Sequence, residues 1–537
     1  MWYLKKSVVN NLLLAAVFLL ISCSGSSGNS KSDIDKSDPV TVALTGQNNT
    51  YNVGPDQKYE EPDTVPWASL TAGDVVNIYY REDPYRWKIA VRGQGTEETP
   101  IIINGVTDAS GNRPKFDFDG ATTASGCNQG GDNNIYDTDS VWSLEDYAGI
   151  MIKGDFGNKP SWITVKNLEL YGANAGASFT NLLGEETDYT ARPAAIWMQP
   201  SSDVLIENCV IYDNAFGIFT MAKDGDLNGA CERIVVRNNR LYENGLPASY
   251  GINQSYLVHN LYIQSVNPVI EGNYIGKLRT TAQGSSYKSR SSGEIFRYNY
   301  VVSSLRAVDW VYSEEQEDGI ASQTDYGIDY AYGNVIINYA ESDRPFAGYP
   351  IHYGGDNEGE QEDNDELHVT SNPYRAHLYF YHNTVINILD QADQWNSAFF
   401  DLSLRGTRVD AWNNIFSTTG TSNTTWLQYS GIVNLAGGNL VHGIDGDAHP
   451  TALELNYSIT EHDPVVTDDP GFTDFENYDF RLDPDSAAVG RAAAVVPDEF
   501  DPDTAYAHLP VIMQPIPGKN GMNTRETADD LGAFESE

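Results

Sequence analysis

The chain has 537 residues, with 33 Lys and Arg against 75 Asp and Glu, and its formal net charge is −42. A chain this acidic lacks the broad basic face that nucleic-acid backbones require, which excludes a nucleic-acid-binding protein. Apolar residues make up 40% of the chain, enough for a large core, and 47 Gly and 33 Tyr accompany many Asn. Without a long amphipathic helical pattern, this composition predicts an all-β chain with many turns.

The N-terminus has the pattern of an export signal. Lys5 and Lys6 precede an apolar run over residues 12–21, which is too short to span a bilayer and is typical of a signal-peptide core. The run ends in the letters LISC, which resemble a bacterial lipobox with Cys23 as the lipidated residue. No Asp follows Cys23 to favour the inner membrane, so we expect an outer-membrane lipoprotein, periplasmic or surface-facing, with a signal peptide over residues 1–23. An ordinary secretory signal with an incidental cysteine is the alternative.

The rest of the chain divides into three parts by composition. Residues 24–40 are small and polar and predict a flexible tether. Residues 41–492 carry the strand-like segments and predict one domain, including a cap at its N-terminal end. Residues 493–537 are Pro-rich and acidic, and we expect this tail to pack on or near the end of the domain and cover its open edge.

Three cysteines remain in the exported part: Cys127, Cys209 and Cys231. An odd number allows at most one internal disulfide plus a free thiol, and the sequence does not identify the pair. No Cys/His spacing matches a zinc site.

A weak repeat begins near residue 160. Each unit has a β-rich run, then an Asn, then apolar residues at alternate positions. The repeated asparagines are Asn167, Asn208, Asn239, Asn273, Asn299, Asn334, Asn383, Asn414, Asn439 and Asn456. Asn tolerates the left-handed backbone conformation of a sharp turn, and its amide can bond to the Asn of the next unit. Spacings of 17 to 49 residues fit stacked coils with insertions as loops. We therefore predict a right-handed parallel β-helix of about ten to twelve coils; a β-propeller or sandwich is the alternative.

A second row of residues supports the stack. Short β segments upstream of the asparagines carry polar residues in register: Thr220, His259, Lys288, Asp309, His352 and Asp401. Parallel coils place equivalent positions about 4.8 Å apart, so this column predicts a groove for a polymer. His259 also alternates with Leu257 and Leu261, and a buried structural histidine is the other interpretation.

Basic residues are concentrated between residues 277 and 306. The segment holds Lys277, Arg279, Lys288, Arg290, Arg297 and Arg306, and its one acid is Glu294. A local excess of cations in an acidic chain indicates a site for an anionic ligand. On a strand, Lys288 and Arg290 face the same side about 7 Å apart, which suits one sugar ring.

Several phrases resemble secreted bacterial right-handed β-helix proteins. They are PYRWK (84–88), GQGTEETPIIINGV (93–106), HNLYIQS (259–265), AQGSSYKSR (282–290), IHYGGD (351–356), PYRAHLYFYHNTV (373–385) and DPGF (469–472). The groove also resembles that of polysaccharide lyases of the chondroitinase B and alginate lyase group, which use a Lys base and an Arg, often with calcium. Lys288-Ser289 matches the Lys-Ser of that group's signature. The nearest later arginine is Arg306, and no Arg-His-Gly follows it.

The resemblance implies cleavage of a uronate polymer by β-elimination, with Lys288 as base and Arg290 as clamp. His259 and His352 are candidate proton-transfer residues. Candidate substrate-binding residues are Arg306, Asp309, Tyr353, Asp356 and Arg279. Calcium is a possible cofactor, and the acidic run 356–366 lacks the spacing of a known calcium loop.

Two other function classes remain open. A glycoside hydrolase needs carboxylates that converge at about 5 to 9.5 Å, and Asp309 and Asp401, the carboxylates of the column, are expected two coils and about 10 Å or more apart. A non-catalytic surface protein that binds glycans through exposed Tyr and Trp is the other. In each case we expect a monomer with an acidic polysaccharide as its partner.

Overall fold

The computed structural model describes residues 48–128, 144–154, 158–222, 226–250, 256–313, 319–340, 349–355, 376–389, 397–402, 406–420, 424–429, 431–444, 457–461, 464–493 and 511–536. All of them belong to one structural unit that spans Gly46–Glu537. Cys23, the signal peptide and the tether lie outside the described residues, as does Asp356. Within those ranges, no helix is both long and apolar enough to cross a membrane.

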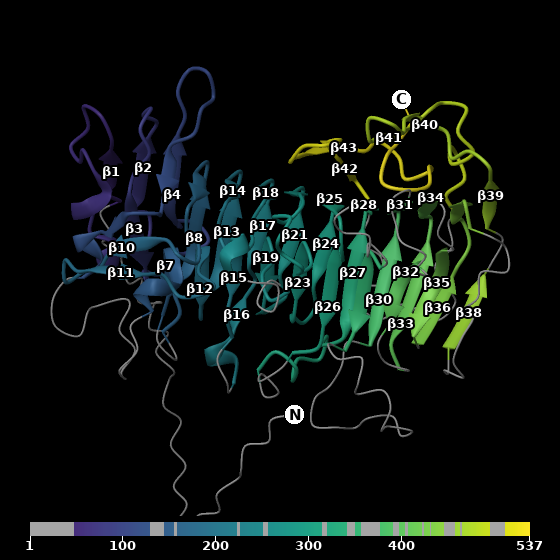
Figure 1. The fold of residues 1–537 in the computed structure, drawn as a ribbon, viewed down its shortest axis with the longest axis horizontal. Coiled ribbons are helices and arrows are strands. Elements are labelled where there is room, and N and C mark those ends of the chain that lie inside the picture. The colour runs from purple at the N-terminus through teal and green to yellow at the C-terminus, as the bar shows by residue number, and fades with distance from the viewer. Residues whose placement is uncertain are drawn as a thin grey trace, which may run out of the picture. The chain divides into compact units, whose positions relative to one another are not determined.

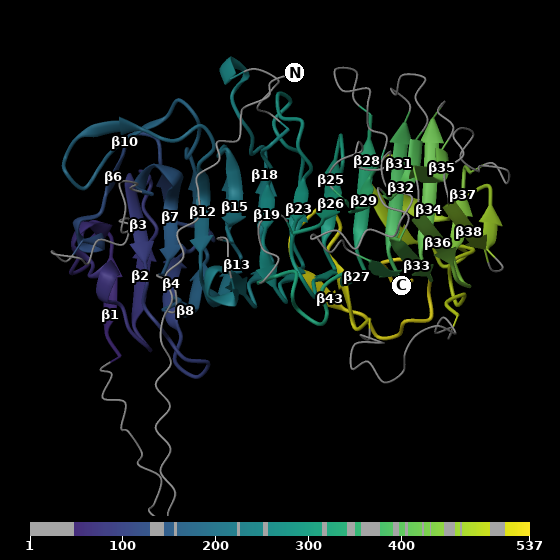
Figure 2. The same cartoon turned by 90° about the horizontal axis from the view of Figure 1, so that it is seen from below.

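The chain winds into a right-handed parallel β-helix, in which each coil contributes one strand to each of three sheets (Figures 1 and 2). Strands of consecutive coils pair in parallel throughout these sheets, except for the antiparallel pair β10–β11. The prediction of an all-β coil stack is therefore confirmed.

Sheet 1 is formed, in spatial order, by β11 (Glu186–Asp188), β10 (Ser178–Thr180), β6 (Ala121–Thr123), β3 (Trp87–Val91), β7 (Ala148–Lys153), β12 (Ala194–Gln199), β15 (Phe216–Thr220), β19 (Leu261–Ile263), β23 (Tyr287–Ser289), β26 (Val308–Val311), β29 (Ile351–Gly354), β32 (Ser397–Leu402) and β35 (Thr424–Tyr429).

Sheet 2 is formed by β1 (Thr50–Val53), β2 (Val75–Tyr79), β4 (Ile101–Val106), β8 (Ser161–Lys166), β13 (Ser202–Glu207), β17 (Val235–Arg237), β21 (Val269–Glu271), β24 (Ile295–Arg297), β27 (Ile328–Tyr332), β30 (His377–Tyr381), β33 (Arg408–Trp412), β36 (Gly431–Leu435) and β38 (Tyr457–Glu461), with β16 (Cys231–Glu232) and β20 (Ser265–Val266) beside it.

Sheet 3 is formed by β5 (Lys115–Asp117), β9 (Glu169–Tyr171), β14 (Val210–Tyr212), β18 (Arg240–Tyr242), β22 (Tyr274–Ile275), β25 (Tyr300–Ser303), β28 (Val335–Tyr339), β31 (Thr384–Leu389), β34 (Ile415–Gly420), β37 (Leu440–His442) and β39 (Val465–Thr467).

Two antiparallel hairpins follow the coils, β40 (Phe472–Asp474) with β41 (Asp479–Leu482) and β42 (Met513–Pro515) with β43 (Met522–Thr524). Short 3-10 turns are η1 (Pro62–Thr64), η2 (Trp67–Ser69), η3 (Ser125–Cys127), η4 (Glu145–Tyr147), η5 (Leu227–Gly229) and η6 (Ala248–Tyr250).

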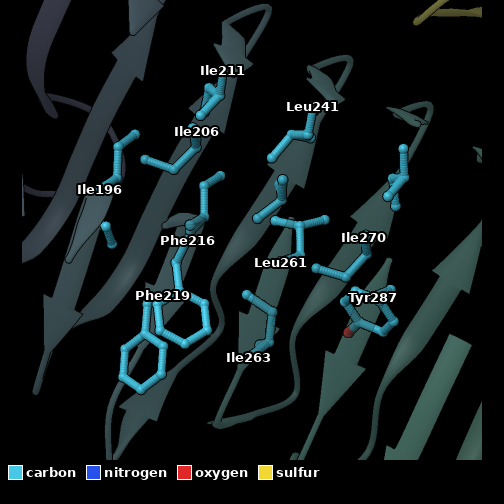
Figure 3. Close-up of a cluster of buried hydrophobic side chains, with 14 of the residues drawn as sticks. Ile196, Ile206, Ile211, Phe216, Phe219, Leu241, Leu261, Ile263, Ile270 and Tyr287 are labelled. Carbon is cyan, nitrogen blue, oxygen red and sulfur yellow. The ribbon is translucent and has the colours of Figure 1, made fainter. Parts of the chain in front are cut away.

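The interior of the coils is filled by apolar side chains from all three sheets. Because side chains alternate along a strand, every second residue points inward. Figure 3 shows Ile206 of β13, Ile211 of β14 and Leu261 of β19 converging there, and all three are fully buried. Burial of this continuous core is the main stabilising contribution.

The turn between sheets 2 and 3 is built by two adjacent rows of residues. Left-handed backbone conformations occur at Asn167, Asn208 and Asn238 and continue along the stack. One position later, buried asparagines bond from coil to coil: Asn239, Asn273, Asn299, Asn334, Asn383, Asn414 and Asn439. The expected single Asn row is therefore two rows, because Asn167 and Asn208 belong to the left-handed positions and bond to each other there. Asn456 lies outside the described residues.

The described C-terminal residues pack along the side of the stack, whereas the sequence predicted that they cover its end. The backbone N–H of Gly521 donates to Gly272, and that of Ile512 to the Tyr298 hydroxyl. Further along, the N–H of Gly532 donates to Asn413. Figure 1 shows this yellow segment lying along the later coils. It therefore covers the row of turns between sheets 2 and 3.

Cys127, Cys209 and Cys231 are buried and free, so the possible disulfide is not formed. Burial raises the pKa of the Cys209 thiol to about 12, which makes it unreactive.

We predict that Asn299→Ala lowers the free energy of unfolding by about 3 kcal/mol. The Asn299 side chain accepts the N–H of Asn273 at 3.1 Å and donates to the carbonyl of Ile270 at 2.8 Å, and its removal leaves these buried groups unpaired. Equilibrium chemical unfolding measures the change. Asn477→Ala, at an exposed asparagine, is the control and should cost under about 0.5 kcal/mol. Equal losses in the two variants would contradict the structural role of the ladder.

Candidate functional site

Sheet 1 carries one outward-facing column of side chains whose chemistry changes halfway. Strand register aligns the residues Trp197, Phe219, Tyr262, Lys288, Asp309, His352 and Asp401 on successive coils. The first three are aromatic and the last four are ionisable. Figure 2 shows the strands that carry most of them, β12 to β29, side by side.

Two members of the expected column are placed differently. Thr220 pairs one position after Phe219, and its hydroxyl donates to the backbone oxygen of Gln264. His259 precedes β19, in which Tyr262 is the residue aligned with Lys288. The sequence aligns both segments by their polar residue, whereas the strand register pairs Phe219 with Tyr262 and Tyr262 with Lys288.

A cleft of about 690 Å³ opens over the junction between the two halves of the column. Its aromatic side is lined by Trp197, Phe216, Phe219 and Tyr262, and its ionic side by His259, Ser285, Lys288, Arg290, Arg306 and Asp309. Lys288 and Arg290 thus share one cleft, as their two-residue spacing on a strand predicted.

Asp309 is the centre of the ionic side. Its Oδ2 accepts from Lys288 Nζ at 3.2 Å and from the Ser285 hydroxyl at 3.4 Å. Its Oδ1 lies 2.5 Å from His352 Nδ1. Burial raises the pKa of Asp309, but Lys288, Arg306 and His352 outweigh that effect and hold the pKa well below its ordinary value. Asp309 is therefore a carboxylate at neutral pH.

Arg306 joins Asp309 to the next acidic residue of the column. Its Nη2 donates to Asp401 Oδ2 at 2.8 Å, and its Nη1 lies 3.5 Å from Asp309 Oδ1. Nη1 also approaches His352 Nδ1 at 3.1 Å. Since a guanidinium can only donate, and His352 Nδ1 is a donor to Asp309, the last approach is a close contact without a hydrogen bond. With 30% of its side chain exposed, Arg306 is more accessible than Lys288, at 12%.

His259 is attached to the same network through Ser285. Its Nδ1 lies 2.9 Å from the Ser285 carbonyl oxygen and 3.0 Å from the Ser285 hydroxyl. The ring packs near Tyr262, with centroids 5.5 Å apart. His259 is buried as the alternating pattern allowed, but it lines the cleft rather than the coil interior.

Arg290 supports the aromatic side. It donates from Nε to the Tyr262 hydroxyl at 2.7 Å and from Nη1 to the Tyr312 carbonyl at 2.7 Å. Only 5% of Arg290 is exposed. Arg290 therefore lies behind Tyr262, where its charge acts on the cleft without much direct access to a ligand. Arg306 is better placed to bind a substrate carboxylate.

Three of the six basic residues that the sequence grouped lie elsewhere. Arg279 forms an ion pair with Asp213, so the predicted substrate-binding role of Arg279 is not supported by its position outside the cleft lining. Lys277 lies over the Tyr339 ring at 4.3 Å. Arg297 pairs with Glu271 on sheet 2. The coil winding turns these three positions to other faces.

Tyr353 is also corrected by the structure. The alternation that points His352 outward sends Tyr353 inward, where it is fully buried and donates to Asp329 Oδ2 at 2.8 Å. Tyr353 therefore cannot donate a proton to a ligand in the cleft.

The aromatic side of the cleft was missed by sequence reasoning. Trp197 and Phe219 stack with ring centroids 4.2 Å apart, and Phe219 meets Tyr262 edge-on at 4.9 Å. The signal was present: each of these residues follows an inward-facing Ile or Leu in its strand, as Lys288 follows Tyr287. A column defined by polar residues does not include them.

No group of three or more His, Cys, Asp or Glu side chains within the described ranges is arranged to hold a metal ion. The acidic run 356–366 lies outside those ranges. The calcium expectation therefore stays a prediction.

No known family model matches the chain, and no curated protein sequence does. Among solved structures, pectate lyase Pel9A is similar over 91% of this chain and 96% of its own, at 11% identity and a TM-score of 0.41. An alginate lyase from Paenibacillus sp. strain FPU-7 is similar over 75% and 96%, at 11% identity and a TM-score of 0.31. A lacto-N-biosidase of group GH136 from Eubacterium ramulus is similar over 78% and 67%, at 13% identity and a TM-score of 0.39. At these scores the likenesses carry no argument about chemistry, which has to come from the site.

We predict that Asp309→Asn destabilises the protein by about 2 kcal/mol at neutral pH, because Lys288 and Arg306 lose their shared carboxylate. The pKa of Asp309 is lower in the folded state than in the unfolded state. Its stabilisation is therefore fully present above the unfolded pKa of about 3.9 and is lost as the pH falls through the folded pKa.

Chemical unfolding at a series of pH values from 7 to about 3 compares the wild type with this variant. The difference in unfolding free energy should stay constant from neutral pH to about 5 and shrink below about 4. A difference that grows on acidification would contradict the network.

Proposed function

We propose that the protein is a polysaccharide lyase that cleaves a uronate-containing acidic polysaccharide by β-elimination. The observation that carries the proposal is the convergence of Lys288, Arg290 and Arg306 on one cleft of sheet 1, in a chain of net charge −42. An anionic polymer is repelled by most of such a surface, so a cationic cleft provides selective binding.

The ionisation of Asp309 favours a lyase over a hydrolase. A glycoside hydrolase needs a carboxylic acid that stays protonated near neutral pH, usually with a raised pKa. The pKa of Asp309 is shifted the other way, and Asp401 is bonded to Arg306. These two carboxylates, two coils and therefore about 10 Å apart along the stack, act as counterions.

Elimination needs three functions from the chain. A clamp neutralises the charge that builds on the uronate carboxylate, a base removes the C5 proton, and an acid protonates the leaving O4. Arg306 supports the clamp because it is permanently charged and partly exposed. Lys288 is the proton-transferring group at the centre of the cleft, and the sequence expectation gives it the role of base.

The aromatic side extends the binding surface along the stack. Trp197, Phe219 and Tyr262 add three coils, or about 10 to 15 Å, to the ionic side. Sugar rings present apolar faces that pack against such residues. A polymer lying parallel to the helix axis would place one sugar at Lys288 and its neighbours against this wall.

The export pattern of the N-terminus supports a substrate outside the cytoplasm. As an outer-membrane lipoprotein held through Cys23, a monomeric enzyme would meet extracellular polysaccharide at the cell surface or in the periplasm.

Incubation with alginate, pectate and glycosaminoglycans tests the proposal. A lyase gives the ultraviolet absorbance of an unsaturated uronate, a hydrolase gives new reducing ends without that absorbance, and a glycan-binding protein gives neither. New reducing ends without the absorbance would contradict the lyase proposal and show a hydrolase.

We predict that Lys288→Ala lowers the elimination rate by about 10³-fold or more while the fold is kept. Proton transfer at the cleft is lost, but the strand remains paired on both sides. Initial rates of absorbance increase measure the loss. Lys166→Ala on sheet 2 removes the same charge far from the cleft and should leave the rate unchanged. A full rate for Lys288→Ala would make Lys288 an ordinary surface residue.

We predict that chelation with EDTA lowers the rate only if calcium shares the neutralisation of the uronate with Arg306. Rates with EDTA and after calcium is added back, at constant ionic strength, measure this contribution. An unchanged rate removes calcium from the mechanism and leaves Arg306 as the clamp.

A further inference from the structure

The hydrogen bonds around His259 fix where its proton lies. The Ser285 carbonyl oxygen, 2.9 Å from Nδ1, can only accept, so Nδ1 carries the hydrogen. In the neutral ring, Nε2 then has the lone pair. The Ser285 hydroxyl, 3.0 Å from Nδ1, can accept from the same N–H while it donates to Asp309 at 3.4 Å. One arrangement of protons thus satisfies these three contacts.

The surroundings of Lys288 favour its charged form, the ammonium. Its Nζ donates to Asp309 at 3.2 Å, and Asp309 is a carboxylate at neutral pH. A carboxylate at this distance stabilises the charged form of an amine. The cleft therefore holds an imidazole whose hydrogen lies on Nδ1 and an amine that donates to a carboxylate.

We propose that His259 is the base of the elimination and that Lys288 is its acid. The assignment rests on the proposed lyase function and reverses the role that the sequence gave to Lys288. The C5–H bond breaks and its proton goes to His259 Nε2. The electron pair of that bond forms the C4=C5 double bond. The C4–O4 bond breaks, and O4 takes its electron pair and a proton from Lys288. Exchange with solvent then restores both groups.

Ser285 and Gly284 are positioning residues for this base. A Cβ added at Gly284 would lie 2.0 Å from the Val258 backbone oxygen and 3.0 Å from His259 Nδ1. Only glycine therefore lets the chain pass close enough for Ser285 to hold the ring. The path from His259 through Ser285 and Asp309 to Lys288 fixes the base and the acid in one network.

Two substrates separate the roles. One is the natural polymer that the wild type cleaves, and the other is a uronate with nitrophenol as the leaving group at O4, which departs without a proton. Lys288→Arg keeps the charge but does not release a proton readily. We expect Lys288→Arg to lose about 10²-fold or more on the polymer and less than about 10-fold on the nitrophenyl substrate. We expect His259→Gln, which can still donate to Ser285, to lose about 10²-fold to 10⁴-fold on both.

The reverse pattern, with His259→Gln active on the nitrophenyl substrate and Lys288→Arg inactive on both, overturns the assignment and restores Lys288 as base. Equal losses on both substrates in both variants also overturn Lys288 as the acid. His377→Gln is the matched control, since His377 pairs with Asp410 at 2.6 Å on sheet 2, away from the cleft. It should leave both rates unchanged.

Neutron diffraction of the wild type tests the proton positions without any substitution. Deuterium on His259 Nδ1 and three deuterons on Lys288 Nζ near neutral pH are expected. Deuterium on His259 Nε2 alone overturns the proposal. If the lyase function itself is wrong, the wild type gives no unsaturated product from any polymer. That result differs from every result that overturns the assignment of base and acid.

Discussion

The parallel register between successive coils is the constraint on which the rest of the structure depends. Backbone pairing fixes which residue of one strand lies beside which residue of the next, so one outward position repeats along sheet 1 about every 4.8 Å. Tyr262, Lys288 and Asp309 become neighbours in this way although they are 21 to 26 residues apart. The buried Asn ladder holds that register at the turn opposite, where the Asn273 amide donates both to Asn299 of the next coil and to the backbone carbonyl of Val236 in the preceding coil.

Electrostatics in the cleft follows from sharing one carboxylate among several cations. Asp309 is nearly buried and contacts Lys288, His352 and Arg306, so its ionised form is strongly favoured. Arg306 has Asp401 as a second counterion. This sharing keeps Lys288 charged, while the cleft lining as a whole still holds more cations than acids. Because the carboxyl groups are ionised counterions, they cannot act as acids. The nitrogen groups of the cleft are then the ones that transfer protons.

The sequence predicted the fold better than the site. Repeated asparagines and alternating apolar residues predict coil stacking directly, because each pattern can be recognised within one short segment of the sequence. The sequence also predicted Lys288, Asp309, His352 and Asp401 as one column. It could not separate the left-handed row at Asn208 from the ladder row at Asn239, since both favour Asn. It grouped Arg279 and Arg297 with Lys288 by distance along the chain, although the coil turns them to different faces. Ser285 gave no signal, because its role depends on how closely Gly284 lets two coils approach.

Hydrogen bonds in the coil interior connect the strands that carry the ionic side of the cleft. Glu294 is fully buried and accepts from the Tyr287 hydroxyl at 2.5 Å and from Trp310 Nε1 at 2.7 Å. Tyr287 and Trp310 are the inward neighbours of Lys288 and Asp309 on β23 and β26. Asp329 accepts hydrogen bonds from the backbone N–H of Glu294 and from the Tyr353 hydroxyl. Tyr353 follows His352 on β29, so this strand belongs to the same hydrogen-bond network. Since a buried carboxylate left without partners is costly, these bonds resist movement of all three strands. Two interior acids thus hold in place the three outward residues of the column that meet at Asp309.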